Sequence, residues 1–285
     1  MLGRTSYALL GLIPAVALAV TVATPASADP ATSVPPALWA NATCLETLAP
    51  EYSPTMWSVT TGSKPVTDYA IANWGSNKYN SGLGGPGTSK NSSDASQITD
   101  AENAGATVLG YVATDYGEGT SQNGYSEADI EDQMSQWYNW YGVTNFFLDE
   151  APTATTYESL YGGLLSYAQT DISSSATTWL NMGAYPASSS WMSKGTEIGD
   201  WESGSAPTAP PSWTIDFLPT QFFGVMNDTP DTSAGISAAV HDLEGAHVGI
   251  GFVTDDDTYQ TLTSSYWDTF TTDASTPGSG SSCEY

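Results

Sequence analysis

Three carboxylates that follow predicted strands could carry acid–base chemistry. Asp149 and Glu150 come directly after the apolar run 146–148, and Glu202 closes a weaker strand candidate at 197–201. Carboxylates beside buried segments are costly unless they are hydrogen-bonded or used in function. Glycoside hydrolysis needs such a set, because one carboxylic acid protonates the leaving oxygen while a second carboxylate acts as nucleophile or base. We therefore predict that Asp149, Glu150 and Glu202 are catalytic, with their individual roles left open.

Each of these acids also has a structural interpretation. Asp149 or Glu150 could cap the next helix, but that helix is expected to begin near Thr156, so capping explains at most one of them. Glu202 could be a solvated loop acid, and its own signal does not decide between the two interpretations. The pattern of all three acids together favours catalysis.

Aromatic and amide side chains near the ends of the same predicted strands could bind a sugar. The chain has 10 Trp and 16 Tyr but only 7 Phe, so its rings are mostly those with a polar edge. Such rings offer a flat apolar face and a polar tip, which suits sugars, although core packing is expected to explain most of them. The predicted substrate-binding residues are Trp57, Asn73, Tyr111, Asp115, Tyr116, Asn181, Tyr185, Trp201 and Gln221.

Other chemistries find little support in the sequence. The two histidines, His241 and His247, fall in a predicted helix and at the start of a predicted strand, where we expect structural roles. This argues against a Ser-His-Asp triad and against a histidine-ligated zinc ion. The acids at 255–257 do not have the spacing of an EF-hand and are interpreted as a helix cap. We predict no metal and no cofactor.

The elements that position these residues alternate between strands and helices. This alternation predicts an α/β fold with a parallel sheet, and eight strands predict a single (β/α)8 TIM-type barrel whose site lies at the strands' carboxyl ends. An open doubly wound sheet is the alternative, but no glycine-rich fingerprint follows the first strand. The predicted strands are 56–59, 69–73, 107–112, 145–148, 178–182, 197–201, 221–225 and 247–253. The predicted helices are 96–104, 126–141, 157–170, 234–243 and 258–270.

The N-terminus has the features of a secretory signal. An apolar run over residues 8–23 follows Arg4, and Ala-Ser-Ala at 26–28 is a cleavage signal. The run is short for a membrane anchor, so we favour cleavage and a secreted, extracellular protein. We predict a signal peptide over 1–28, an irregular lead-in over 29–50 and a barrel domain over 51–285.

Two cysteines lie near the two ends of the exported chain. Disulfides form in oxidising compartments, so we predict a bond between Cys44 and Cys283 that ties the termini together. This pairing suits a closed barrel, in which the first and last strands are neighbours.

The chain is strongly acidic. Its formal net charge is −26, with 5 lysines and arginines in total, and Arg4 is the sole arginine. Such a chain has few cationic side chains that could bind phosphate groups, which argues against nucleic acids and anionic membranes as partners. We expect a polysaccharide partner, no membrane contact after signal cleavage, and a monomer.

Several motifs resemble those of the spherulation-specific family 4 proteins, which are classed in glycoside hydrolase family 135. The motifs are VLGYVATDYG at 108–117, WYNWY at 137–141 and FLDEA at 147–151. Similar segments are IAN at 71–73, GGPG at 84–87, LNMG at 180–183 with Met182 where proline is usual, and WE at 201–202. The similarity extends in order from about Trp57 to Val253.

The resemblance implies a (β/α) barrel and hydrolysis of a polysaccharide that contains N-acetylgalactosamine. The functional acids of the family would then correspond to Asp149, Glu150 and Glu202. A non-catalytic carbohydrate-binding or coat protein with the same barrel is the alternative. A secreted esterase is disfavoured because no Ser-His pairing is recognisable.

Overall fold

The computed structural model describes residues 44–62, 64–79, 84–117, 125–195, 197–202, 204 and 210–276. The predicted signal peptide, the lead-in up to residue 43, and Cys283 lie outside these residues. The predicted Cys44–Cys283 disulfide therefore stays a prediction. Among the described helices, none combines the length and the apolar character that crossing a bilayer would require.

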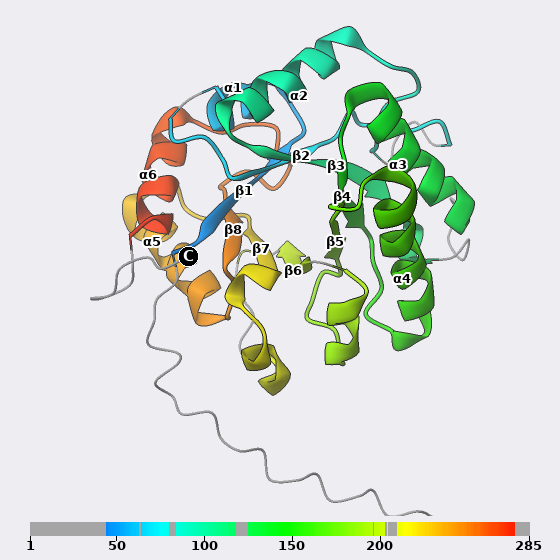
Figure 1. Cartoon of the computed structure of the whole chain (residues 1–285). Helices are drawn as coiled ribbons and strands as arrows, with labels where there is room; N and C mark the ends of the chain where they lie inside the picture. Colours follow the sequence, from blue (N-terminus) through cyan, green and yellow to red (C-terminus); the bar gives the residue numbers. More distant parts are fainter. Residues whose placement is uncertain are drawn as a thin grey trace, which may run out of the picture. The chain divides into compact units, whose positions relative to one another are not determined.

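Eight parallel strands form a closed barrel in sequence order (Figure 1). The last strand pairs with the first, with Glu46 opposite Ile250. The predicted TIM-type fold is thus confirmed. The strands are β1 (Glu46–Glu51), β2 (Tyr69–Ala72), β3 (Thr107–Ala113), β4 (Asn145–Asp149), β5 (Thr178–Asn181), β6 (Glu197–Glu202), β7 (Phe222–Met226) and β8 (Ile250–Val253).

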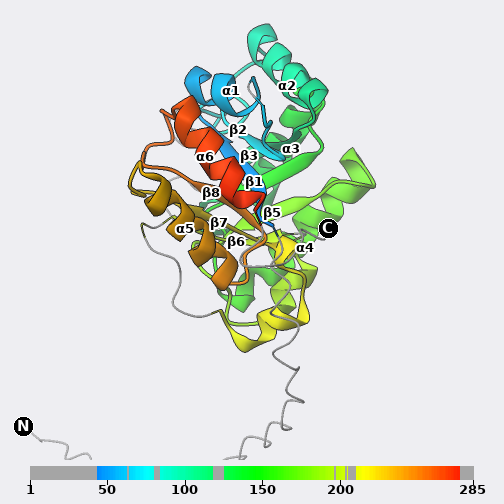
Figure 2. The ribbon, with the colours of Figure 1, turned by 90° about the vertical axis from the view of Figure 1, so that its left-hand side faces the viewer.

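Helices cover the outside of the barrel, and α5 and α6 lie side by side over β8 and β1 (Figure 2). In the described residues, short 3-10 helices replace α-helices between β5 and β7. The α-helices are α1 (Pro54–Thr60), α2 (Ser92–Ala104), α3 (Glu127–Tyr141), α4 (Glu158–Tyr167), α5 (Ser233–Gly245) and α6 (Ser264–Ala274). The shorter helices are η2 (Asp115–Gly117), η3 (Thr155–Tyr157), the π-helix η4 (Ala168–Ile172), η5 (Ser189–Ser193), η6 (Ser212–Asp216) and η7 (Pro219–Gln221).

The first strand lies earlier than predicted. Residues 56–59 were expected to form it, but they belong to α1, and β1 occupies the end of the predicted lead-in. The reason is local: the side chain of Ser53 caps the helix by accepting a hydrogen bond from the Met56 N–H, and Pro54 occupies the first helical turn. Pro50 obscures the strand because it has no N–H to donate to a sheet.

Strand alternation sorts side chains into the barrel or outward to the helices. On β4, Phe146 and Leu148 face the helices, whereas Phe147 belongs to a row of aromatic rings that pack at tilted angles inside the barrel. Phe147 lies 5.6 Å from Phe223, which lies 5.4 Å from Trp179, between ring centroids. Because successive residues alternate, Asp149, two positions after Phe147, points to the same side, at the carboxyl end of the barrel.

Candidate active site

Asp149 is held by residues from two neighbouring strands. The Tyr111 hydroxyl, on β3, donates to one carboxylate oxygen. The Asn181 amide, on β5, donates to the other over 2.6 Å. Tyr111 rests on the ring of Phe147, with centroids 6.1 Å apart. The structure thus brings together three of the residues predicted from the sequence, and both oxygens of Asp149 have fixed partners.

Glu150 has an unusual backbone conformation. Its φ is 59°, in the left-handed region that residues other than glycine, Asn and Asp rarely adopt. Hydrogen bonds hold this turn: the N–H of Tyr116 donates to the Glu150 carbonyl over 2.9 Å, and Thr114 donates to the Asp149 carbonyl. Strain of this kind persists only where the surroundings impose it, and it clusters at functional sites. The turn directs consecutive carboxylates to different surroundings.

Glu150 lines a cavity of about 270 Å³. Its Oε2 atom has no hydrogen-bond partner among the described residues, in contrast to Asp149. Buried polar atoms nearly always have a partner, so the carboxylate of this cavity-lining residue has hydrogen-bonding capacity that the described residues do not use. The other residues that line the cavity are Tyr52, Asn73, Gly75, Gly84, Tyr111 and Gln260.

The surroundings of the two acids also raise their pKa values. Burial is the main cause for Glu150, and the nearby charges of Asp149 and Asp115 add to it. Burial also raises the pKa of Asp149, although its hydrogen bonds to Tyr111 and Asn181 oppose this rise. Tyr111 has a pKa raised well above its usual value, because it is buried and lies beside Asp149, so it remains a hydrogen-bond donor. Glu150 therefore keeps a proton to higher pH than an ordinary glutamate does.

Asp115 and Tyr116 lie beside this pair but differ in accessibility. Asp115 is only 2% exposed, so its effect on a substrate would be indirect, through the charge it places near Glu150. Tyr116 is 55% exposed and has a φ of 56°. An exposed ring next to Glu150 remains a candidate sugar platform.

Asn73 and Trp57 lie on the side of the barrel that β1 and β2 form. Asn73 lines the Glu150 cavity, and its side-chain oxygen accepts hydrogen bonds from the N–H groups of Gly75 and Gly85. Trp57 is 5% exposed and lines a second, adjoining cavity rather than the one at Glu150. Trp57 belongs to helix α1 rather than to the predicted strand, and its predicted role in substrate binding stays a prediction.

Tyr185 and Gln221 are not brought to the site. Gln221 immediately precedes β7, and Tyr185 packs on Phe222, the first residue of that strand. Both lie around the amino end of β7, opposite the end that carries Asp149. The Tyr185 hydroxyl donates to the Ala246 carbonyl, which gives this tyrosine a structural role.

The backbone of β6 places Trp201 and Glu202 at the carboxyl end of the barrel, with Glu202 opposite Val225. A register shift falls between Gly199 and Glu202. Their side chains lie outside the part of the chain that the structure describes. The predicted roles of Trp201 and Glu202 therefore stay predictions.

Four residues of the cavity, Tyr52, Gly75, Gly84 and Gln260, were not among the predicted site residues. Tyr52 follows β1, and its ring lies 6.1 Å from that of Tyr111, edge to face. Gly84 approaches Tyr111 so closely that an added Cβ would lie 2.6 Å from the ring. Gln260 belongs to the loop after β8. A correct placement of β1 would have drawn attention to Tyr52, whereas nothing in the local sequence marks Gln260.

The fold and site together define a TIM-type barrel with a carboxylate pair at the carboxyl end of β4. Residues 79–274 match the spherulation-specific family 4, and the chain belongs to this family. Among curated protein sequences, none matches the chain significantly. Among the described residues, no cluster of His, Cys, Asp and Glu side chains could hold a metal ion.

Solved structures share the fold at low sequence identity. Sph3 of Aspergillus clavatus, in complex with GalNAc, is 16% identical, with a TM-score of 0.61 over 83% of this chain and 99% of that one. The spore cortex-lytic enzyme SleL of Bacillus cereus is 9% identical, with a TM-score of 0.49 over 81% and 75%. A family GH18 chitinase of Chromobacterium violaceum is 10% identical, with a TM-score of 0.49 over 81% and 82%.

Proposed function

We propose that this protein is a secreted glycoside hydrolase that cleaves an amino-sugar polysaccharide by acid–base chemistry. The observation that carries the proposal is the position of Glu150, which lines a cavity and has a buried carboxylate oxygen without a hydrogen-bond partner among the described residues. A hydrogen-bonded carboxylate lies next to it in the chain. This combination fits the paired carboxylates of glycoside hydrolysis.

Glu150 is the proton donor in this proposal. Its raised pKa keeps the proton in place until the glycosidic oxygen takes it up as the bond to the sugar breaks. The proton moves to the leaving oxygen, and Glu150 is left as a carboxylate. A positioned general acid typically contributes roughly 10²–10⁴-fold to the rate.

Asp149 stabilises positive charge that develops on the sugar ring. Tyr111 and Asn181 fix both of its oxygens, so it is oriented before substrate binds. Glu202, at the carboxyl end of β6, is then the partner that activates water or attacks the sugar. The separation of the carboxylates would decide whether configuration at the anomeric carbon is inverted or retained.

The substrate class follows from charge and family. Among the described residues that line the Glu150 cavity there is no Lys, Arg or His, which suits a neutral or positively charged sugar better than an anionic one. Membership of spherulation-specific family 4 and the GalNAc held by Sph3 both favour a polymer of N-acetylgalactosamine. The predicted signal peptide supports an extracellular site of action.

Reducing-end release from a panel of amino-sugar polymers tests the proposal. We expect release from a polymer of N-acetylgalactosamine by the wild type, and a loss of roughly 10²-fold or more in Glu150→Gln and Glu202→Gln. Glu127→Gln is the matched control, because Glu127 is an exposed glutamate on α3, away from both cavities. It should retain wild-type activity.

Absence of release by folded wild type on every polymer would contradict the proposal. If the same protein still bound one of these polymers, the chain would be a carbohydrate-binding protein with the same barrel. Equal loss in Glu127→Gln and Glu150→Gln would also contradict it, because the effect would then not depend on the site.

A further inference from the structure

A second cavity, of about 360 Å³, adjoins the one at Glu150. Tyr52, Asn73 and Gly75 line both cavities, so the two cavities lie against each other at these residues. The second cavity extends away from the barrel axis, toward α1 and α2. Its further lining residues are Glu51, Ser53, Pro54, Trp57, Trp74, Asn91, Asp94 and Gln97.

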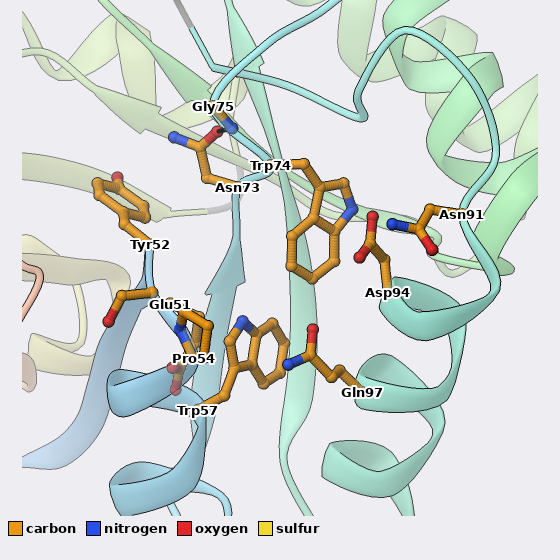
Figure 3. A pocket seen from close by; sticks show the side chains of 11 residues that line it. Glu51, Tyr52, Pro54, Trp57, Asn73, Trp74, Gly75, Asn91, Asp94 and Gln97 are labelled. Carbon is orange, nitrogen blue, oxygen red and sulfur yellow. Dashed lines mark hydrogen bonds between the residues drawn. The ribbon is translucent and has the colours of Figure 1, made fainter.

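Two stacked indoles lie in the middle of this second cavity. The rings of Trp57 and Trp74 are nearly parallel, with an interplanar angle of 22° and centroids 5.7 Å apart. Asn73 lies to one side of them and Asp94 and Gln97 of α2 to the other (Figure 3). Flat apolar rings surrounded by short amide and carboxylate side chains are a common lining for polar ligands with apolar faces.

Three buried polar atoms of residues that line this cavity have no hydrogen-bond partner among the described residues. They are the indole nitrogens Nε1 of Trp57 and Trp74, and Oε2 of Glu51. Glu51 is fully buried, and its other oxygen accepts a hydrogen bond from the Thr60 hydroxyl. Unpaired buried polar groups are uncommon in native proteins, and three around one cavity need an explanation.

We propose that this second cavity is an additional sugar-binding subsite for the same polysaccharide, next to the unit held at Glu150. A sugar hydroxyl both donates and accepts, so one ring could satisfy indole N–H groups and carboxylate oxygens. Among the described residues that line the cavity there is neither a Lys nor an Arg, and Asp94 adds negative charge, so the lining favours a neutral or cationic unit over an anionic one. The protein would then bind an internal stretch of polymer rather than a single terminal unit.

This inference rests on the proposed substrate class. Binding measurements test the subsite independently of catalytic turnover. The Glu150→Gln variant is titrated with N-acetylgalactosamine oligosaccharides of increasing length and with their de-N-acetylated counterparts. Calorimetry gives the dissociation constant, and tryptophan fluorescence reports on Trp57 and Trp74. We expect the dissociation constant to fall with length until both cavities are filled, and the fluorescence to change only for oligomers that reach the second cavity.

Two substitutions on α2 test the residues themselves. Asp94 and Gln97 are only partly buried, so Asp94→Ala and Gln97→Ala should fold, which circular dichroism checks. Each substitution should remove most of the gain in affinity that comes with oligomer length. The dissociation constant of the longest oligomer should rise about tenfold, which corresponds to about 1.4 kcal/mol of binding free energy. Asp100→Ala is the matched control, because Asp100 is exposed on the same helix and lines neither cavity.

The outcomes distinguish the two proposals. Length-dependent binding that Asp94→Ala abolishes, in a wild type that cleaves nothing, would support the subsite and contradict the hydrolase. Normal cleavage with length dependence unchanged in both α2 variants would overturn the subsite alone. The de-N-acetylated series shows whether the carboxylates favour a free amine: tighter binding would support a role of Asp94 charge in the subsite.

Discussion

Asp149 and Glu150 are neighbours in the chain with opposite surroundings. The carboxylate of Asp149 is fixed by Tyr111 and Asn181, whereas Glu150 lines a cavity and has an oxygen that no described residue hydrogen-bonds. The left-handed backbone at Glu150 produces this difference, because it turns the chain between the two side chains. Two carboxyl groups can take different catalytic roles when their surroundings differ, and the surroundings here favour Glu150 as the general acid.

The charge of Asp115 should set part of the pH dependence. Asp115 raises the pKa of Glu150, so Asp115→Asn should lower that pKa. A general acid works only while protonated, and the alkaline limb of the kcat/KM profile should therefore move to lower pH. Asn tolerates the φ of 53° at this position, so the fold should persist. An unchanged alkaline limb would mean that another group controls it.

Gly84 should be intolerant of any side chain. Its φ is 79°, and an added Cβ would lie 2.6 Å from Tyr111 and 2.8 Å from Asn73. We expect Gly84→Ala to cost about 1–2 kcal/mol from backbone strain and to lower kcat/KM by tenfold or more, because Tyr111 must move. Gly142→Ala is the control, since φ is 80° there and nothing lies within 4 Å. Equal losses of activity in the two variants would contradict the claimed contact.

At the scale of elements, the loop after β8 is organised by one side chain. Asp256 was expected to cap a helix from about residue 258, but α6 begins at Ser264, and Asp256 instead folds the loop that carries Gln260. Its carboxylate accepts from the backbone N–H groups of Thr258, Gln260 and Thr261, at 2.8, 3.0 and 2.7 Å. Although burial opposes it, these threonine hydrogen bonds hold the pKa of Asp256 well below its usual range.

Loss of this carboxylate should loosen the loop. We expect Asp256→Ala to lower the free energy of unfolding by roughly 1–3 kcal/mol and to raise KM, because Gln260 lines the Glu150 cavity. Denaturant unfolding and steady-state kinetics measure the two effects. Asp257→Ala is a matched control on an exposed neighbour, and it should be neutral. A neutral Asp256→Ala would show that the loop is held by other contacts.

The sequence predicts most of the barrel but not all of the site. Strands such as β4 are recognisable because Phe146, Phe147 and Leu148 form an apolar run, as buried parallel strands do. β1 escapes recognition because it begins and ends with glutamate and contains Pro50. Asp149 could be predicted from its strand, whereas Gln260 is placed by the hydrogen bonds of a distant loop, which no local pattern encodes.

At the scale of the whole molecule, buried glutamates should link stability to pH. Burial raises the pKa of both Glu51 and Glu197 to about 8. A raised carboxyl pKa means that the folded state binds the proton more tightly than the unfolded chain does. The contribution of this proton binding to the free energy of unfolding is fully present below the ordinary glutamate pKa. It is lost as pH rises toward about 8. The protein should therefore be most stable in mildly acidic solution.

Unfolding curves across this range test the link. Glu197→Gln removes one titrating group, so its free energy of unfolding should fall less steeply than that of wild type between about pH 5 and pH 8. Glu127→Gln, on the exposed face of α3, should leave the slope unchanged. A Glu197→Gln slope identical to that of wild type would contradict the burial of this charge.

The most direct test of the account is the dependence of hydrolysis on the leaving group. Aryl glycosides of short N-acetylgalactosamine oligosaccharides with acidic leaving groups need no proton, whereas those with basic leaving groups do. We predict that Glu150→Gln hydrolyses the first kind at close to the wild-type rate and the second at least about 10²-fold more slowly. Equal slowing of both kinds would show that Glu150 does not protonate the leaving oxygen.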